Sequence, residues 1–181
     1  IVARERLLEL RTTAGSNIAA ATPGTFVDDA FALELPDTVE PPSTGATIEW
    51  VRASQIQSQL SLFGEDGPSA DDEWQGELGD CYLLSTLCIL AARSPASVRA
   101  LFAYPTGTSQ LSPDGRYRIR FVVDGAETEV EIDDRLPCLV APSAVTRPIF
   151  AKHCSYAVAQ AGGTGKLWVC LVEKAYAKAF G

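Results

Sequence analysis

The amino-acid sequence predicts an α+β fold in which helices pack against a small antiparallel sheet. Three observations support this prediction. An apolar run with helical spacing occupies residues 81–92. Residues 117–132 contain two alternating apolar and polar segments, and the Asp124-Gly125 dipeptide between them is typical of a hairpin turn. Residues 167–179 form a further helical pattern, which we expect to be an amphipathic helix.

The composition is that of an ordinary globular protein. The chain has 181 residues, of which 46% are hydrophobic and 21% are charged, enough for one domain with a sizeable core. Its formal net charge of −8 comes from 15 basic and 23 acidic residues. This charge argues against a nucleic-acid partner, because such binding needs a basic face. No apolar run approaches the length that a membrane-spanning helix needs.

The cysteine and histidine content bears on compartment and on metal chemistry. The five cysteines have no framework spacing, which favours reduced thiols in the cytosol or nucleus; we expect a cytoplasmic, intracellular protein. Zinc is not expected, because His153 is the single histidine and there is no Cys-x-x-Cys pair. The glycines of residues 162–165 are too weak a pattern for a phosphate-binding loop, so no organic cofactor is expected.

Residues 1–45 are predicted to form an N-terminal helix and an extended linker. The helix is amphipathic and covers residues 1–11, and the Ala/Thr/Ser/Gly-rich residues 12–24 after it form a flexible connection. Residues 25–35 are expected to lie over the surface of the core, and a proline-rich loop completes the linker. The chain begins at Ile1 and contains no methionine, which leads us to expect a piece of a longer protein or a processed one.

Residues 46–181 are predicted to form the folded domain. A short extended segment at residues 48–51 opens it. The helix over residues 81–92 is followed by a second short helix over residues 95–102, which has proline at its first position. Residues 136–159 contain three separate prolines and are expected to be rich in loops.

The loop before residue 81 has the features of a site for a thiol nucleophile. Gly76 and Gly79 punctuate a tight loop, and Asp80 is a good N-cap, which places Cys81 at the first helical position. A helix N-terminus carries unpaired N–H groups and partial positive charge, which favour a thiolate over a thiol. The side-chain amide of Gln75 lies close enough along the loop to form an oxyanion hole with the backbone N–H of Cys81.

A packed, unreactive thiol at Cys81 is the alternative, because free cysteines are among the most buried residue types. The residue pattern by itself leaves both interpretations open. Alkylation separates them: a packed Cys81 reacts with iodoacetamide no faster than Cys138 or Cys154.

Four segments of the chain resemble the calpain family of papain-like cysteine proteases. Residues 75–84, Gln-Gly-Glu-Leu-Gly-Asp-Cys-Tyr-Leu-Leu, are similar to its active-site segment, although members usually carry Trp where Tyr82 stands. The other segments are Ile48–Arg52 with its Trp-x-Arg pattern, the Asp-Asp-Arg-Leu-Pro strand end of residues 130–137, and the Glu-Lys-Ala-Tyr-Ala-Lys helix of residues 167–178. They occur in the family's order and cover about the first half of its protease core.

This resemblance implies a papain-like half-core: the calpain-type first subdomain, with a central helix that bears the nucleophile at its N-terminus. Cys81 would be the nucleophile and Gln75 part of the oxyanion hole. In papain-like enzymes the catalytic His lies about 130–150 residues after the Cys, so His153 is not expected to be the base. A second subdomain beyond Gly181 would supply His and Asn, and we expect this chain alone to be inactive. The parent would be an intracellular endopeptidase making limited cuts in protein substrates.

The acidic, glycine-rich residues 64–73 raise the question of a Ca²⁺ site. Clustered oxygens on such a loop can bind Ca²⁺, although a solvated acidic loop is the more ordinary interpretation. The resemblance implies a Ca²⁺ site here that uses main-chain carbonyls and an Asp nine residues before the nucleophile. Asp72 matches that position, and Gly67 falls near a carbonyl-donating one. We expect weak Ca²⁺ binding or none in this chain.

A calpain-like pseudoprotease, acting as a protein-binding or scaffold module, is the alternative function. Cys81 and Gln75 argue against it, but a second subdomain without the His would favour it. The sequence after Gly181 decides between the two, through a His near a Gly and an Asn before Pro-Trp.

Overall fold

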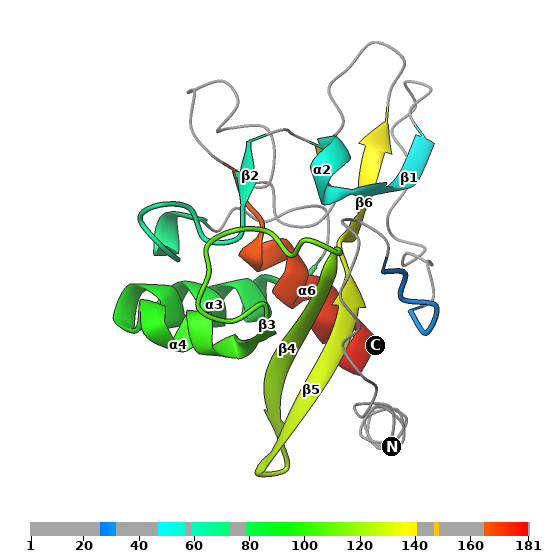
Figure 1. Cartoon of the computed structure of the whole chain (residues 1–181). Helices are drawn as coiled ribbons and strands as arrows, with labels where there is room; N and C mark the ends of the chain where they lie inside the picture. Colours follow the sequence, from blue (N-terminus) through cyan, green and yellow to red (C-terminus); the bar gives the residue numbers. More distant parts are fainter. Residues whose placement is uncertain are drawn as a thin grey trace.

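The computed structural model describes residues 26–31, 47–56, 59–72, 79–140, 147–148 and 165–180. In this part of the chain, helix α6 (Trp168–Phe180) lies between a three-stranded antiparallel sheet and a pair of helices (Figure 1). The sheet consists of β3 (Phe102–Tyr104), β4 (Arg116–Val123) and β5 (Ala126–Asp133), and the helix pair of α3 (Cys81–Arg93) and α4 (Pro95–Leu101). The mixed helix and sheet architecture agrees with the predicted α+β class.

Helix α3 covers the residues that the sequence predicts, with one additional residue at its C-terminal end. Its inner face is apolar and buried through Leu83, Leu84, Leu87 and Ala91. The helix ends where the backbone N–H of Ser94 donates to the carbonyl of Leu90. Helix α4 then begins at Pro95, where a missing N–H costs nothing. Both helix predictions are confirmed.

The β4–β5 hairpin is also confirmed. Val123 pairs with Ala126, so Asp124 and Gly125 form a two-residue turn. Their φ values are 50° and 74°, and a two-residue turn with both φ values positive matches the twist of the flanking strands. The alternating pattern places Tyr117, Ile119, Val130 and Ile132 in the core.

The prediction of loops over residues 136–159 is wrong for its first part. Residues Arg135–Val140 form strand β6, which pairs antiparallel with β1 (Thr47–Arg52) and with β7 (Arg147–Pro148). Pro137 sits within β6 opposite Trp50. The strand forms because a partner far earlier in the chain supplies its hydrogen bonds, and local propensity does not report such a partner.

Short elements complete the described chain. Helix α2 (Ala53–Ile56) follows β1, and the 3₁₀ helix η1 (Ala70–Asp72) precedes the segment that leads to α3. Strand β2 (Leu60–Ser61) pairs in parallel with β8 (Gly165–Lys166), which leads directly into α6. No helix in these ranges is long and apolar enough to cross a bilayer.

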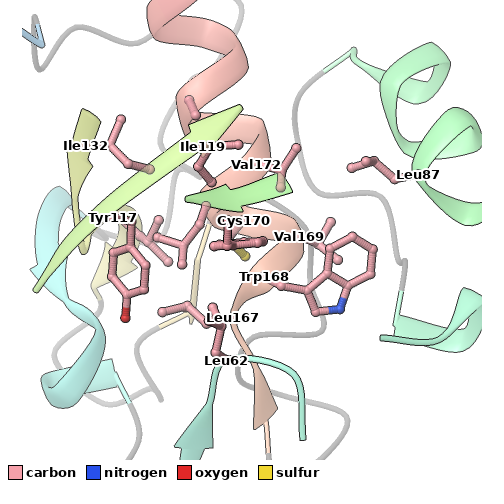
Figure 2. Close-up of a cluster of buried hydrophobic side chains, with 14 of the residues drawn as sticks. Leu62, Leu87, Tyr117, Ile119, Ile132, Leu167, Trp168, Val169, Cys170 and Val172 are labelled. Carbon is pink, nitrogen blue, oxygen red and sulfur yellow. The ribbon is translucent and has the colours of Figure 1, made fainter. Parts of the chain in front are cut away.

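The core gathers around α6. Figure 2 shows Trp168, Val169, Cys170 and Val172 of this helix among side chains from the hairpin and from α3. Most residues of α6 are buried, including the charged Glu173, Lys174 and Lys178. The predicted helix over residues 167–179 is confirmed. Its charged side chains are buried as well as its apolar ones, because they have partners inside the protein.

The lysines of α6 form a buried network of ion pairs and hydrogen bonds with the sheet. Lys174 Nζ lies 2.5 Å from Asp133 Oδ1 and donates to the carbonyls of Asp133 (3.0 Å) and Arg135 (2.7 Å). Lys178 Nζ donates to both carboxylate oxygens of Asp28, at 2.8 and 2.7 Å, and to the carbonyl of Glu131 at 2.7 Å. The described residues 26–31 thus lie against the core, as predicted for the segment that contains them.

Burial and pairing act in opposite directions on these groups. Burial lowers the pKa of Lys174 below its ordinary value, and the neighbouring Asp133 only partly compensates. For Asp133, burial alone would raise the pKa, but the Lys174 ammonium and the hydrogen bonds to the carboxylate together bring the pKa below its ordinary value. Asp133 is therefore held in its charged form at neutral pH.

The cysteines of the described residues differ in oxidation state. Cys81, Cys88 and Cys138 are free, whereas Cys170 is disulfide-bonded. The prediction that all five cysteines are reduced is therefore wrong for Cys170.

Candidate functional site

Cys81 is the exposed first residue of α3. The helix starts where the carbonyl of Asp80 accepts the backbone N–H groups of Leu83 (2.9 Å) and Leu84 (3.2 Å). The first N–H groups of a helix have no acceptor within it, and at this start they belong to Cys81 and the residue after it. The interpretation of Cys81 as a packed core thiol is wrong, because the side chain is open to solvent.

Asp80 occupies the predicted N-cap position but does not cap the helix with its side chain. Its backbone has φ −104° and ψ 29°, and its carboxylate makes no capping hydrogen bond. The Oδ1 atom is buried and has no hydrogen-bond partner among the described residues. The start of α3 is therefore set by the main chain.

Tyr82, the residue after Cys81, belongs to a group of partly exposed aromatic rings. Tyr82 is 59% exposed, and its ring lies edge to face with that of Tyr176 at a centroid distance of 6.0 Å. Tyr176 in turn contacts Phe121 and Phe180. We refer to these four residues as the aromatic cluster. A hydrogen bond with Tyr176 and, to a smaller extent, burial raise the pKa of Tyr82 above its ordinary value.

The sequence did not reveal the aromatic cluster, because its members come from α3, β4 and α6. A signal existed at Tyr82, which stands where calpain-family members usually carry Trp and retains a large ring. The other three rings belong to patterns that predict a strand and a helix. Only the packing of these elements brings the rings together.

Two residues weighed for a catalytic role lie outside the described residues. Gln75, the predicted side-chain donor of the oxyanion hole, is one, and its distance from Cys81 stays a prediction. His153, which we do not expect to be the base, is the other. Since it is the single histidine of the chain, the described residues contain none.

Asp72 and Gly67, the predicted Ca²⁺ ligands, both contact the ammonium group of Lys166. Lys166 Nζ is 2.7 Å from Asp72 Oδ1 and donates to the carbonyl of Gly67 at 2.8 Å. Asp72 is buried, and its Oδ2 atom accepts the indole N–H of Trp168 and the backbone N–H of Ser69, both at 2.8 Å.

This donor set, as arranged, fits an ammonium rather than Ca²⁺. Ca²⁺ takes six to eight oxygen ligands, whereas one carboxylate oxygen and one carbonyl meet here at a lysine. The described residues contain no group of three or more His, Cys, Asp or Glu side chains placed to hold a metal ion. The expectation of weak Ca²⁺ binding or none in this chain stays a prediction.

Comparison with known proteins gives a consistent result. A family model described as "Calpain family cysteine protease" matches residues 26–181. The chain is 28% identical to the calpain-type cysteine protease DEK1 of Zea mays, over 98% of the chain and 8% of that protein. It is 35% identical to DEK1 of Arabidopsis thaliana over 80% of the chain, and 30% identical to calpain-13 of Rattus norvegicus over 86%. The chain spans 6% of that DEK1 and 22% of that calpain-13.

Proposed function

Because the chain belongs to the calpain family of cysteine proteases, we propose that it is the nucleophile-bearing half of an intracellular endopeptidase that makes limited cuts in proteins. Its fold in this proposal is the first subdomain of a papain-like core. The observation that carries the proposal is the exposed thiol of Cys81 at the first position of α3. A nucleophile has to be reachable by substrate, and the first N–H groups of a helix can donate to an oxyanion that forms beside it.

In the proposed mechanism, the Cys81 thiolate attacks the carbonyl carbon of a peptide bond. A C–S bond forms, and the carbonyl oxygen becomes an oxyanion that accepts hydrogen bonds from the Cys81 backbone N–H and the Gln75 side chain. The C–N bond then breaks, and the leaving amine takes the proton that the general base removed from the thiol. Water hydrolyses the resulting acyl-enzyme and regenerates the free cysteine.

The general base and its orienting partner would come from a second subdomain, as the family resemblance implies. We propose that this subdomain faces the start of α3 across a cleft that holds the substrate. The aromatic cluster supports this orientation, because its exposed member Tyr82 presents apolar surface directly beside Cys81. A ligand that binds the aligned arrangement of the two halves preferentially would switch the protease on.

The test is cleavage of casein by the full-length protein and its Cys81→Ser variant. We expect Cys81→Ser to lower kcat/KM by about 10³-fold or more, because the nucleophile is lost. Gln75→Ala should lower kcat by about 10²–10³-fold through loss of one oxyanion donor. The 181-residue chain alone should show no cleavage.

Cys88→Ser is the matched control, because Cys88 lies on the same helix and is half-buried with its thiol directed at the Ala70 carbonyl. It should retain activity. Cleavage that survives Cys81→Ser would contradict the mechanism. A fully inactive wild-type protein would favour the alternative of a pseudoprotease that acts as a binding module.

A further inference from the structure

The loop that carries Asp72 and Gly67 is organised around the side chain of Lys166. The lysine stands in β8, which pairs in parallel with β2 at the start of the loop. The backbone N–H groups of Gly165 and Leu167 donate to the carbonyls of Gln59 and Ser61, both at 3.0 Å. These bonds fix the main chain on both sides of Lys166, and its side chain extends into the loop, where Nζ contacts Gly67 and Asp72.

The loop leaves space for the lysine stem. At Gly64, which has φ 71°, a Cβ atom would come within 2.7 Å of Lys166 Cε. At Gly67, with φ 83°, a Cβ atom would lie 3.0 Å from the Arg99 guanidinium, so a second cation also lies close to this carbonyl-donating residue. Glycine is favoured at both positions, because a side chain would be strained at these φ values and would have to displace the lysine stem or the Arg99 guanidinium.

The charge balance of the loop depends on the same lysine. The Asp72 side chain is 5% exposed and that of Lys166 16%. A carboxylate this deeply buried needs a charged partner. One of its oxygens already receives two neutral N–H donors, from Ser69 and Trp168. The ammonium contacts the other oxygen and the Gly67 carbonyl, at the centre where a bound cation would contact both.

We infer that the Lys166 ammonium takes the place of Ca²⁺ in this loop, so that the loop keeps its structure without the ion. The inference concerns residues 62–72 and Lys166, and it does not depend on the proposed protease activity. A covalently attached cation is always present, whereas the occupancy of a bound ion depends on the concentration of that ion. This half of the molecule would therefore be insensitive to Ca²⁺ at the Asp72 position.

The first experiment measures Ca²⁺ binding to the 181-residue chain by isothermal titration calorimetry, with the Asp72→Asn variant and Mg²⁺ as controls. We expect no Asp72-dependent binding of Ca²⁺ up to about 1 mM, the weak end of protein Ca²⁺ sites. The melting temperature should be the same in CaCl₂ and in EDTA. Sub-millimolar Ca²⁺ binding that Asp72→Asn abolishes would overturn the inference.

The second experiment replaces the ammonium group of Lys166, with Lys166→Glu and Lys166→Met as a matched pair. Both substitutions remove the ammonium, and Lys166→Glu also adds carboxylate oxygens beside Asp72. In EDTA, both should melt at a lower temperature than wild type. Adding Ca²⁺ should raise the melting temperature of Lys166→Glu, with a Ca²⁺ affinity at least about tenfold above that of wild type. Lys166→Met should respond less, because it offers fewer ligands.

The outcomes distinguish a lysine that substitutes for Ca²⁺ from a lysine that only forms a structural ion pair with Asp72. If the two variants lose the same stability and neither gains affinity for Ca²⁺, Lys166 serves only as a structural partner of Asp72, and the inference is wrong. The Ca²⁺ titration of the wild-type chain still tests the inference if a variant fails to fold without Ca²⁺. In that case, folding of Lys166→Glu upon addition of Ca²⁺, but not of Mg²⁺, supports the inference.

Discussion

The start of α3 and the inner side of α6 differ in how far their polar groups are buried and paired. At the start of α3, the Cys81 thiol is exposed and the Asp80 Oδ1 atom has no hydrogen-bond partner among the described residues. On α6, the Lys174 ammonium is fully buried and reaches three oxygen acceptors. The contrast indicates that α6 organises the stable core, whereas the start of α3 exposes the thiol at which the proposed chemistry takes place.

Two free cysteines show the same contrast. Cys81 is exposed, whereas Cys138 is fully buried in β6. Burial raises the pKa of the Cys138 thiol to about 12, because a thiolate there would lose its hydration. The thiolate is the reactive form, so the fold itself determines which of these thiols can react.

The largest expected effect is a difference in alkylation. In the folded chain at pH 8, Cys138 should react with iodoacetamide about 10³-fold more slowly than in the urea-unfolded chain, because its pKa rises from 9.0 to about 12. Cys81 should react readily in both states. The rates are measured by peptide mass spectrometry after timed quenching. Equal rates at Cys81 and Cys138 in the folded chain would remove the contrast between the two thiols.

The next effect concerns the buried network. Lys174→Met should lower the free energy of unfolding by about 3–5 kcal/mol, because it leaves the Asp133 carboxylate buried without its ammonium. Tyr82→Phe is the control at the start of α3. It removes a hydroxyl from a 59% exposed residue and should cost less than about 1 kcal/mol.

Urea denaturation followed by circular dichroism measures both values. If the two substitutions cost the same, α6 does not carry the greater share of stability that we assign to it.

The smallest effect is a difference in acid sensitivity. The pKa of Asp133 is lower in the folded chain than its ordinary value of 3.8, so the unfolded chain binds more protons in this window. The stability that this carboxylate contributes is therefore present above about pH 4 and is lost as the pH falls through the folded pKa. Asp133→Asn should be less stable at neutral pH but should lose less stability than wild type between about pH 5 and pH 2.

Asp134→Asn is the matched control for the acid experiment. Burial raises the pKa of Asp134 above 3.8, although Arg52 opposes the shift. The folded chain then binds more protons than the unfolded one as the pH falls, so Asp134 offsets part of the acid-induced loss. Its removal should make acid unfolding steeper. Identical acid profiles for the two variants would contradict the opposite pKa shifts.

The sequence predicted the elements whose signals are local. The Asp124-Gly125 turn allows only a narrow set of backbone conformations, and it joins the strands as expected. The start of α3 was also predictable, because an apolar helical run follows Asp80 directly. The position of Cys81 at the helix start followed from that boundary alone, while the placement of Gln75 stays a prediction.

Partners distant in the sequence decided the remainder. Strand β6 exists because β1 pairs with it, and the lysines of α6 are buried because Asp28 and Asp133 lie opposite them. Lys166 meets Asp72 only through the pairing of β8 with β2. The sequence by itself determined where helices and turns begin, because capping and turn geometry depend on adjacent residues. Only the tertiary structure determined which charges are buried and paired, because a partner's position depends on the whole fold.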